Sequence, residues 1–140
     1  MKFLLDTPLL AELLRAHAED WSARWVDAFN EDEIYLSAIT VGEVVQNIET
    51  ESDPNRRQAL YDWLHEELLV RFHGRIIEPD LATFIEWGKI NAMKEESGKA
   101  LSVVDALIAA TVRAKGLVLI TFNRDVFAGL GLEVSDPWQG

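Results

Sequence analysis

The 140-residue chain contains no cysteine, and this absence excludes disulfides, thiolate metal sites and cysteine nucleophiles. The absence of cysteine favours a reducing compartment, so a cytoplasmic location is expected. Only three histidines are present, and they are too scattered along the sequence to predict a zinc site. Carboxylates remain as the main candidates for chemistry.

Long apolar runs are also lacking. The N-terminal stretch MKFLLDTPLLAELLR is interrupted by Asp6 and Glu12 and is too short to predict a membrane span or an export signal. No low-complexity tract, internal repeat or Gly/Ser linker marks a domain boundary. Because 49% of the residues are hydrophobic, the chain can fill one sizeable core. We therefore expect a single domain over residues 1–140 with no membrane association.

Positive charge is scarce. The chain has 13 Lys and Arg residues against 24 Asp and Glu, a formal net charge of −11. Between His17 and Asp53, ten carboxylates accompany one cation, Arg24. Most of these carboxylates are expected on solvated helix faces. Phosphate contacts normally supply most of the affinity for nucleic acid, so the composition taken alone argues against nucleic-acid binding.

The sequence does have a regular alternation of short β-branched or apolar runs with longer segments of helical period. Strands are predicted at Lys2–Leu5, Ile34–Leu36, Arg75–Ile77, Leu117–Thr121 and Glu133–Val134. Such alternation is typical of βαβ units, so the predicted fold class is α/β with a mostly parallel sheet.

Two helix starts can be recognised between these strands. Asp53 followed by Pro54 predicts one start, and Asp80 predicts another. In the second helix, an apolar stripe of Leu81, Phe84, Ile85 and Gly88 predicts the face that packs on the core.

Three carboxylates stand at the ends of predicted elements. Asp6 ends the first strand, Glu43 follows the second, and Asp105 lies in LSVVDALIAATV. Each has a structural interpretation, because Thr40-x-x-Glu43 and Ser102-x-x-Asp105 fit capping boxes and Asp6 could cap the next helix. Asp105 in addition looks buried, which requires a partner for its charge.

Taken together, the three carboxylates favour a second interpretation. In an open parallel sheet, strand carboxyl ends and helix N-termini meet at one edge, where ligands bind. Converging carboxylates repel one another unless a hard cation joins them, and Mg²⁺ or Mn²⁺ suits such an oxygen-only ligand set. This arrangement is typical of metal-assisted phosphodiester hydrolysis.

The order of several short motifs makes the chain similar to a known family. FLLDT, YLSAITVGEV, RIIEPD, WGKINA, LSVVDALIAATVRAKGLVLITFN and DPW follow one another in this sequence. In that order they resemble a VapC-type toxin of the PIN-domain ribonuclease family, over nearly the whole chain. The resemblance implies a PIN-like α/β/α sandwich with a central mostly parallel sheet, and an endoribonuclease that uses Mg²⁺ or Mn²⁺ to cleave structured RNA by metal-activated water.

The resemblance also implies site residues. Asp6, Glu43 and Asp105 match the first three acidic positions of the family, as catalytic residues and metal ligands. Asn123 holds the fourth position, and a further acid, Asp125, stands one residue earlier than is usual, so either could complete the site.

Two departures bear on activity. The family's Asp-Thr-Asn is Asp6-Thr7-Pro8 here, and its usual Arg is Phe122. Pro8 removes an amide donor and a backbone N–H beside Asp6, while Phe122 removes a guanidinium that could hold phosphate. Both changes leave the fold intact and are expected to weaken activity. They also motivate an alternative, a non-catalytic PIN-fold binding module with a degraded acidic site.

The resemblance further implies partners. A toxin of this type is held by a cognate VapB-type antitoxin, acts on tRNA or rRNA, and forms a homodimer. A surplus of large apolar residues agrees with self-association: Trp21, Trp25, Trp63, Trp87 and Trp138. Six of the cations outside the acidic stretch are expected to form a rim that holds the RNA backbone: Arg56, Arg57, Lys89, Lys94, Lys99 and Arg124. A receiver-like or dehalogenase-like phosphoryl-transfer domain lacks support, because no Lys follows LVLIT and no Asp-x-Asp follows the first strand.

Overall fold

Five short parallel strands form the centre of the protein. The structure, a computed structural model, describes residues 1–8, 10, 30–98 and 101–136. The strands are β1 (Phe3–Leu5), β2 (Ile34–Ser37), β3 (Ile76–Ile77), β4 (Val118–Ile120) and β5 (Glu133–Ser135). They lie in the order β3-β2-β1-β4-β5, and every pairing is parallel. All five predicted strands are confirmed, with ends that differ by one residue at most.

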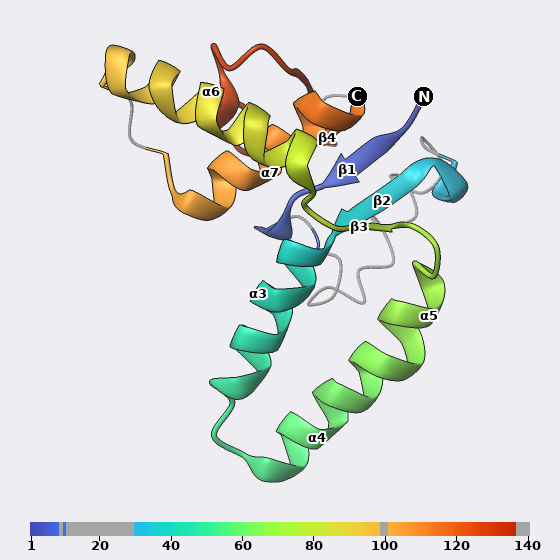
Figure 1. The fold of residues 1–140 in the computed structure, drawn as a ribbon. Coiled ribbons are helices and arrows are strands. Elements are labelled where there is room, and N and C mark those ends of the chain that lie inside the picture. Colours follow the sequence, from blue (N-terminus) through green and yellow to red (C-terminus); the bar gives the residue numbers. More distant parts are fainter. Residues whose placement is uncertain (9, 11–29, 99–100, 137–140) are drawn as a thin grey trace.

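Helices flank this sheet on both sides. They are α3 (Ala38–Glu49), α4 (Pro54–Trp63), α5 (Leu69–Arg71), α6 (Leu81–Ser97), α7 (Val103–Lys115) and α8 (Arg124–Phe127). A 3-10 turn, η1 (Glu31–Glu33), precedes β2, and a π-helical turn, η2 (Leu64–Leu68), joins α4 to α5. Figure 1 shows α3 and the α4-to-α5 rod running side by side away from the sheet, and we call this pair the helical limb. Helices α6 and α7 lie on the other side.

Two apolar cores separate the layers. On β1, Leu4 belongs to the core beneath α6 and α7, whereas Leu5 belongs to the core beneath the helical limb. Successive strand residues point to opposite faces, so neighbouring leucines serve different cores. Both are fully buried, and each burial contributes about 1.5–3 kcal/mol. The predicted α/β/α sandwich is confirmed.

The helix starts follow the sequence. The Asp53 side chain accepts a hydrogen bond from the Asn55 N–H at 3.1 Å, with Pro54 in the first helical turn. The Asp80 side chain accepts one from the Thr83 N–H at 3.0 Å. These contacts satisfy amide groups that have no partner inside the helix.

The predicted core stripe of α6 was wrong. Leu81, Phe84 and Ile85 are exposed, by 77%, 48% and 53%, and Gly88 is exposed as well. The inward face instead carries Thr83 and Ile90, both fully buried, with Trp87 half-buried between them. The prediction missed this face because it counted apolar residues only, and Thr83 carries a polar hydroxyl. The hydroxyl donates to Asp80 Oδ1 at 3.0 Å, which allows the residue to be buried.

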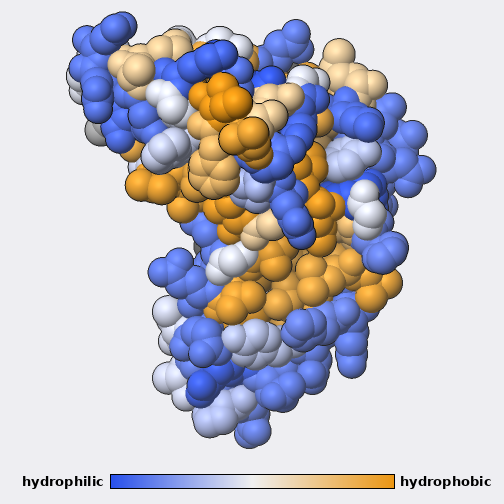
Figure 2. Space-filling view, in the orientation of Figure 1, coloured by the Kyte–Doolittle hydropathy of each residue, from blue (hydrophilic) through white to orange (hydrophobic). Residues whose placement is uncertain are grey.

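The surface is divided by polarity. Figure 2 shows apolar side chains gathered across the middle of one face, where the helical limb meets the sheet, and hydrophilic side chains at both ends. No helix among the described residues combines the length and apolar character that crossing a membrane requires.

Candidate functional site

The carboxyl end of the central strand carries a buried carboxylate, Asp6. Its side chain is 4% exposed and accepts a hydrogen bond from the Thr121 hydroxyl, which follows β4. The Asp6 N–H donates to the Ile120 carbonyl at 3.2 Å, extending the β1–β4 pairing by one residue. Buried carboxylates are costly unless they are hydrogen-bonded or paired, so this placement is a specific feature of the fold.

Glu43 reaches the same edge from α3. The Thr7 hydroxyl, next in the chain after Asp6, donates to Glu43 Oε1 at 2.5 Å and lies 3.0 Å from the Thr40 hydroxyl. Glu43 is half-buried. Two of the three predicted acids, Asp6 and Glu43, are therefore brought together by the turn after β1. We call the carboxyl ends of β1, β2 and β4, with Asp6, Thr7 and Glu43, the acidic edge.

Asp105 lies in the first turn of α7, and its predicted burial was wrong. The side chain is half-buried, because Asp105 stands at the beginning of the helix rather than within its buried part. Ser102 caps the helix by accepting a hydrogen bond from the Asp105 N–H at 3.0 Å. The capping interpretation is thus confirmed for Ser102. A carboxylate in this turn is favoured by the partial positive charge of the helix N-terminus.

The second predicted capping box, Thr40-x-x-Glu43, was wrong. Helix α3 begins three residues earlier, where the Ser37 hydroxyl accepts a hydrogen bond from the Ile39 N–H at 3.1 Å. Thr40 therefore lies inside the helix, and Thr40 and Glu43 are one turn apart on the same side. Both side chains contact Thr7.

Asn123 and Asp125 lie beyond β4 and are both exposed. The Asn123 N–H donates to the Thr121 hydroxyl oxygen at 3.0 Å, so the backbone at Asn123 is joined to the residue that holds Asp6. Asp125 lies two residues further on, in the first turn of α8. Phe122, at the position where the sequence resemblance implies an Arg, packs half-buried against the core beneath the helical limb.

The acidic edge fits a hard divalent cation in its donor chemistry, since its side chains offer only oxygen and include a buried carboxylate. The described residues nevertheless contain no group of three or more acidic or histidine side chains gathered closely enough to hold a metal ion. The structure brings Asp6 and Glu43 to one edge and leaves Asp105 outside any such three-residue group.

Sequence reasoning missed the hydroxyl groups of this site. Thr7, Thr40 and Thr121 make side-chain hydrogen bonds at this site, and Thr40 and Thr121 are fully buried. The available signal was positional: Thr7 stands two residues after the first predicted strand, and Thr121 is the last residue of the fourth. Buried hydroxyls at the ends of parallel strands need polar partners, and here those partners are the acids.

A contrasting carboxylate lies at the start of α6. Asp80 accepts hydrogen bonds from Lys115, from the Thr83 N–H and from the Thr83 hydroxyl. The Lys115 ammonium group has the largest effect, and together these donors lower the pKa of Asp80 to about 2. Similarly, a hydrogen bond from Arg71 lowers the pKa of Glu31.

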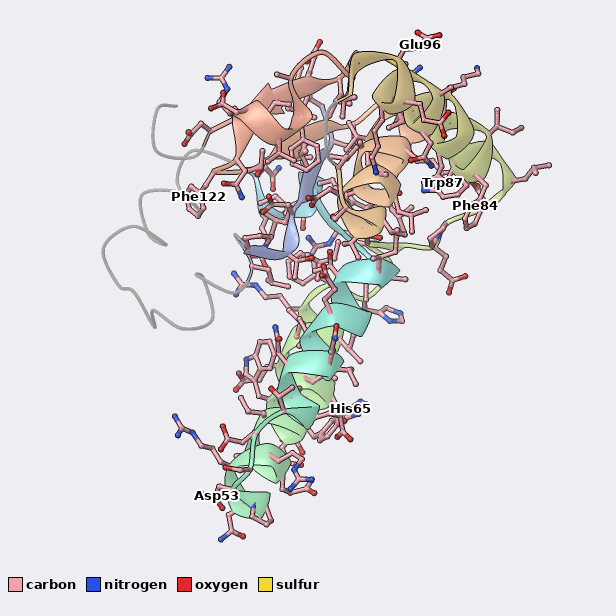
Figure 3. All side chains as sticks on the ribbon, turned by 90° about the vertical axis from the view of Figure 1, so that its left-hand side faces the viewer. Asp53, His65, Phe84, Trp87, Glu96 and Phe122 are labelled. Atoms are coloured by element: carbon pink, nitrogen blue, oxygen red, sulfur yellow. The ribbon has the colours of Figure 1, made fainter. Side chains whose placement is uncertain are left out.

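The predicted cationic rim is only partly placed near the acidic edge. Arg56 and Arg57 lie in the first turn of α4 beside Asp53, which Figure 3 shows at the tip of the helical limb, away from the sheet. Lys94 donates to the Leu101 carbonyl, and Lys99 lies outside the described residues. Arg124 begins α8, next to Asn123.

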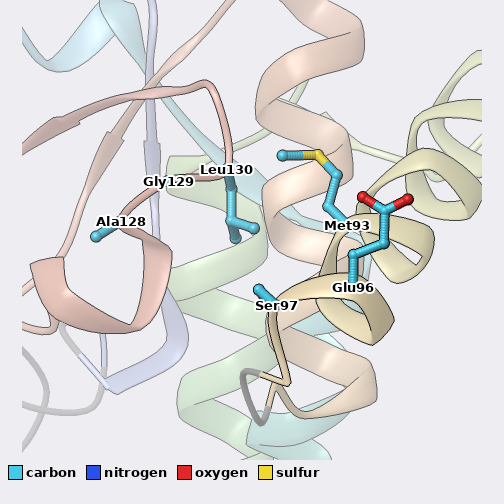
Figure 4. A pocket seen from close by; sticks show the side chains of 6 residues that line it. All are labelled: Met93, Glu96, Ser97, Ala128, Gly129 and Leu130. Carbon is cyan, nitrogen blue, oxygen red and sulfur yellow. The ribbon is translucent and has the colours of Figure 1, made fainter.

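A hollow of about 350 Å³ lies elsewhere, between the end of α6 and the turn after α8 (Figure 4). Its lining consists of Met93, Glu96, Ser97, Ala128, Gly129 and Leu130. None of the sequence-predicted site residues takes part in it. Its single carboxylate, on Glu96, gives it no resemblance to the predicted acidic site.

A family model identifies the architecture. The model described as PIN domain matches residues 3–131. The chain belongs to the PIN domain family. The resemblance to a VapC-type PIN-domain toxin, predicted from the sequence motifs, is confirmed.

Relatives of this PIN-domain chain carry toxin and ribonuclease names. It is 32% identical to VapC ribonuclease Y4jK of Sinorhizobium fredii over 136 residues, 97% of each chain. It is 29% identical to the toxin FitB of Neisseria gonorrhoeae, over 97% of this chain and 98% of that protein. A tRNA(fMet)-specific endonuclease VapC of Salmonella typhimurium is 25% identical over 97% and 98%. These relatives place the chain among toxin nucleases.

Solved structures agree with this assignment. The crystal structure of FitAcB from Neisseria gonorrhoeae superposes with a TM-score of 0.89 at 28% identity, covering 99% of both chains. The DNA-bound VapBC complex from Salmonella typhimurium superposes with a TM-score of 0.83 at 25% identity, covering 98% of both chains.

Proposed function

We propose that the protein is the toxin of a toxin–antitoxin pair and acts as an endoribonuclease that requires Mg²⁺ or Mn²⁺. One observation carries the proposal: a PIN domain whose buried Asp6 and half-buried Glu43 are held at the carboxyl edge of the sheet by threonine hydroxyls. A structural acid is normally satisfied by cations and amides, as Asp80 is. Asp6 and Glu43 accept hydrogen bonds from neutral threonine hydroxyls, which orient a carboxylate without neutralising its charge.

The ligand set that we propose is Asp6, Glu43 and Asp105, with Asn123 or Asp125 completing it. A divalent cation bound there would supply positive charge to a phosphoryl oxygen and would lower the pKa of water. Asp6 provides a carboxylate fixed by Thr121, and Glu43 one fixed by Thr7. Asp105 provides a carboxylate at the N-terminus of α7, which also favours an anionic phosphate nearby.

We propose structured RNA, tRNA or rRNA, as the substrate. The chain's net charge of −11 opposes the approach of phosphate, and the bound cation offsets this repulsion locally. Arg124, exposed and next to Asn123, is well placed in sequence to hold the RNA backbone beside the site. A tRNA-directed relative makes tRNA the first substrate to test.

Cleavage of a tRNA pool in the presence and absence of metal tests this function. The purified chain should cut tRNA with Mg²⁺ or Mn²⁺ and stop when EDTA removes the metal, because the carboxylates alone leave phosphate repelled. Asp105→Asn and Asp125→Asn make the same chemical change at two acids of the proposed site. Comparing their cleavage rates shows which of the two acids is essential for cleavage and which is accessory. No cleavage with any divalent metal would favour the alternative, a non-catalytic PIN-fold binding module.

We further propose a VapB-type antitoxin as the partner, with both proteins in the cytoplasm. The acidic stretch from His17 to Asp53 suits a basic, partly disordered segment, and solved VapBC complexes share this fold. Residues 17–29 of that stretch lie outside the described residues. Co-expression with the product of the adjacent small gene should yield a complex that survives moderate salt. Two proteins that purify separately would contradict this partner.

A homodimer of single domains, each covering residues 1–140, also stays a prediction. Trp21, Trp25 and Trp138, which motivated it, lie outside the described residues, and Trp63 and Trp87 are half-buried. The exposed Leu81, Phe84 and Ile85 offer apolar surface on α6, and Figure 3 shows Phe84 at the outer side of the molecule beside Trp87. The mass in solution at micromolar concentration should be that of a dimer, and a monomeric mass would refute it.

A further inference from the structure

A chain of hydrogen bonds links Thr40 to Glu43 through Thr7. The Thr7 Oγ1 lies 3.0 Å from the Thr40 Oγ1 and 2.5 Å from Glu43 Oε1. Thr40 is fully buried, whereas Thr7 and Glu43 are half-buried. Two residues one turn apart on α3 therefore contact the same hydroxyl, which comes from the segment after β1.

The number of protons fixes the direction of this chain. A threonine hydroxyl has one proton to donate, and an ionised carboxylate can only accept. The Thr7 hydroxyl donates its proton to Glu43 Oε1. Thr7 can then only accept from Thr40, and Thr40 must be the donor in their contact. The chain runs from Thr40 to Thr7 to Glu43.

Thr40 is unusual for a threonine inside a helix. Such hydroxyls commonly bond to the carbonyl one turn earlier, as the Thr111 hydroxyl does to the Leu107 carbonyl at 2.8 Å. Among the described residues, the Thr40 hydroxyl has Thr7 as its hydrogen-bond partner instead. The buried hydroxyl of Thr40 thus bonds across to another element, and its donated proton determines where the Thr7 proton points.

We propose that Thr40 is a positioning residue for the metal site, acting on Glu43 through Thr7. Its hydrogen bond locks the Thr7 hydroxyl in the orientation that holds Glu43 Oε1, which leaves Oε2 available to a cation. This role rests on the proposed function, because it takes Glu43 as a metal ligand. Partners that orient a ligand typically change metal affinity by about 10–100-fold when they are removed.

A metal-free experiment tests the hydrogen-bond chain by itself. Unfolding in EDTA is measured for Thr40→Val, Glu43→Ala and the double variant, first with Thr7 intact and then with Thr7→Val. The Thr40–Glu43 coupling should change the unfolding constant at least about threefold with Thr7 intact and should vanish with Thr7→Val. A coupling that persists without the Thr7 hydroxyl, or that is absent with it, overturns the chain.

Mn²⁺ titration, followed by the electron paramagnetic resonance signal of the free ion, tests the positioning role. Thr40→Val keeps the side-chain shape but removes the hydroxyl, so Mn²⁺ should bind about 10-fold more weakly. Thr40→Ser keeps the hydroxyl and should bind within about twofold of the wild type. Thr111→Val, which removes an equally buried hydroxyl outside the site, should leave Mn²⁺ affinity unchanged.

The outcomes separate this inference from the proposed function. Wild-type affinity in Thr40→Val, or no rescue by Thr40→Ser, overturns the positioning role while the metal site stands. Equal Mn²⁺ affinity in the wild type and Glu43→Ala overturns Glu43 as a ligand, and with it the role of Thr40 toward the metal. The hydrogen-bond chain is then still decided by the metal-free cycle.

Discussion

Glu43, inside α3, and Asp80, the N-cap of α6, are carboxylates with opposite surroundings. Asp80 receives Lys115 and two donors from Thr83, which together lower its pKa to about 2. Glu43 receives the Thr7 hydroxyl, and within the described part of the chain it has no cationic partner. A carboxylate satisfied by its own fold has little affinity left for a ligand. One held in place by a neutral donor is oriented but keeps its full charge.

The same contrast applies to Asp105, which, like Asp80, lies at the N-terminal end of a helix. The Asp105 N–H is satisfied by Ser102, while its carboxylate pairs with no cation among the described residues. Helix capping at α7 is therefore performed by the serine. This carboxylate is the one that we propose as a metal ligand.

The largest expected effect comes from Asp105→Asn. Loss of a metal ligand should lower tRNA cleavage by at least about 100-fold, since even the loss of a residue that supports a ligand costs about 10–100-fold. Folding should be intact or improved, because one anion is removed from an acidic region. Cleavage rates and thermal melts with and without Mn²⁺ measure both effects.

Asp80→Asn is the matched control for this variant. It makes the same chemical change in the structural acid, and cleavage should stay close to the wild-type rate. If Mn²⁺ instead raises the melting temperature of the wild type and of Asp105→Asn equally, Asp105 is not a ligand and the contrast between the two acids fails.

Much of this architecture could be predicted from the sequence. The five strands were predictable because their apolar runs are short and bounded by turn residues, as in Val118–Ile120. The place of Asp6 at the edge of the sheet was predictable, since Asp6 directly follows β1. The inward face of α6 was not predictable from apolar periodicity, because Thr83 is buried through its bond to Asp80.

The hydrogen bonds inside the site could not be predicted from the sequence either. Thr40-x-x-Glu43 has the spacing of a capping box, and only the position of Ser37 shows that the helix begins earlier. A threonine and a glutamate three residues apart share a helix side whether or not they cap it. The spacing alone does not show that both side chains contact Thr7, because Thr7 is more than thirty residues away in the chain.

A smaller effect is expected from Ser102→Ala, which separates helix capping by Ser102 from the metal binding that we propose for Asp105. Removing the cap that accepts from the Asp105 N–H should cost about 1 kcal/mol of the free energy of unfolding. Cleavage should fall far less than in Asp105→Asn, because the carboxylate is still present. Urea unfolding and the cleavage assay give the two values. A loss of activity as large as that of Asp105→Asn would mean that the helix start itself, rather than the acid, is what the site needs.

The smallest effect is expected in the pH dependence that Asp80 contributes. Its pKa is lowered from 3.8 to about 2 in the folded protein, so its ionised form stabilises the fold above about pH 4. That contribution is lost as the pH falls through 2. The difference in melting temperature between the wild type and Asp80→Asn should therefore be constant above pH 4 and shrink below it.

Lys115→Met removes the largest cause of the lowered pKa of Asp80. That pKa, followed by the NMR signal of the Asp80 carboxyl carbon, should then rise toward 3.8. Because the ion pair is largely exposed, both changes in melting temperature should be small. An unchanged pKa in Lys115→Met would show that the cap at Thr83 alone satisfies Asp80, and the structural acid would then differ less from Glu43 than the ion pair indicates.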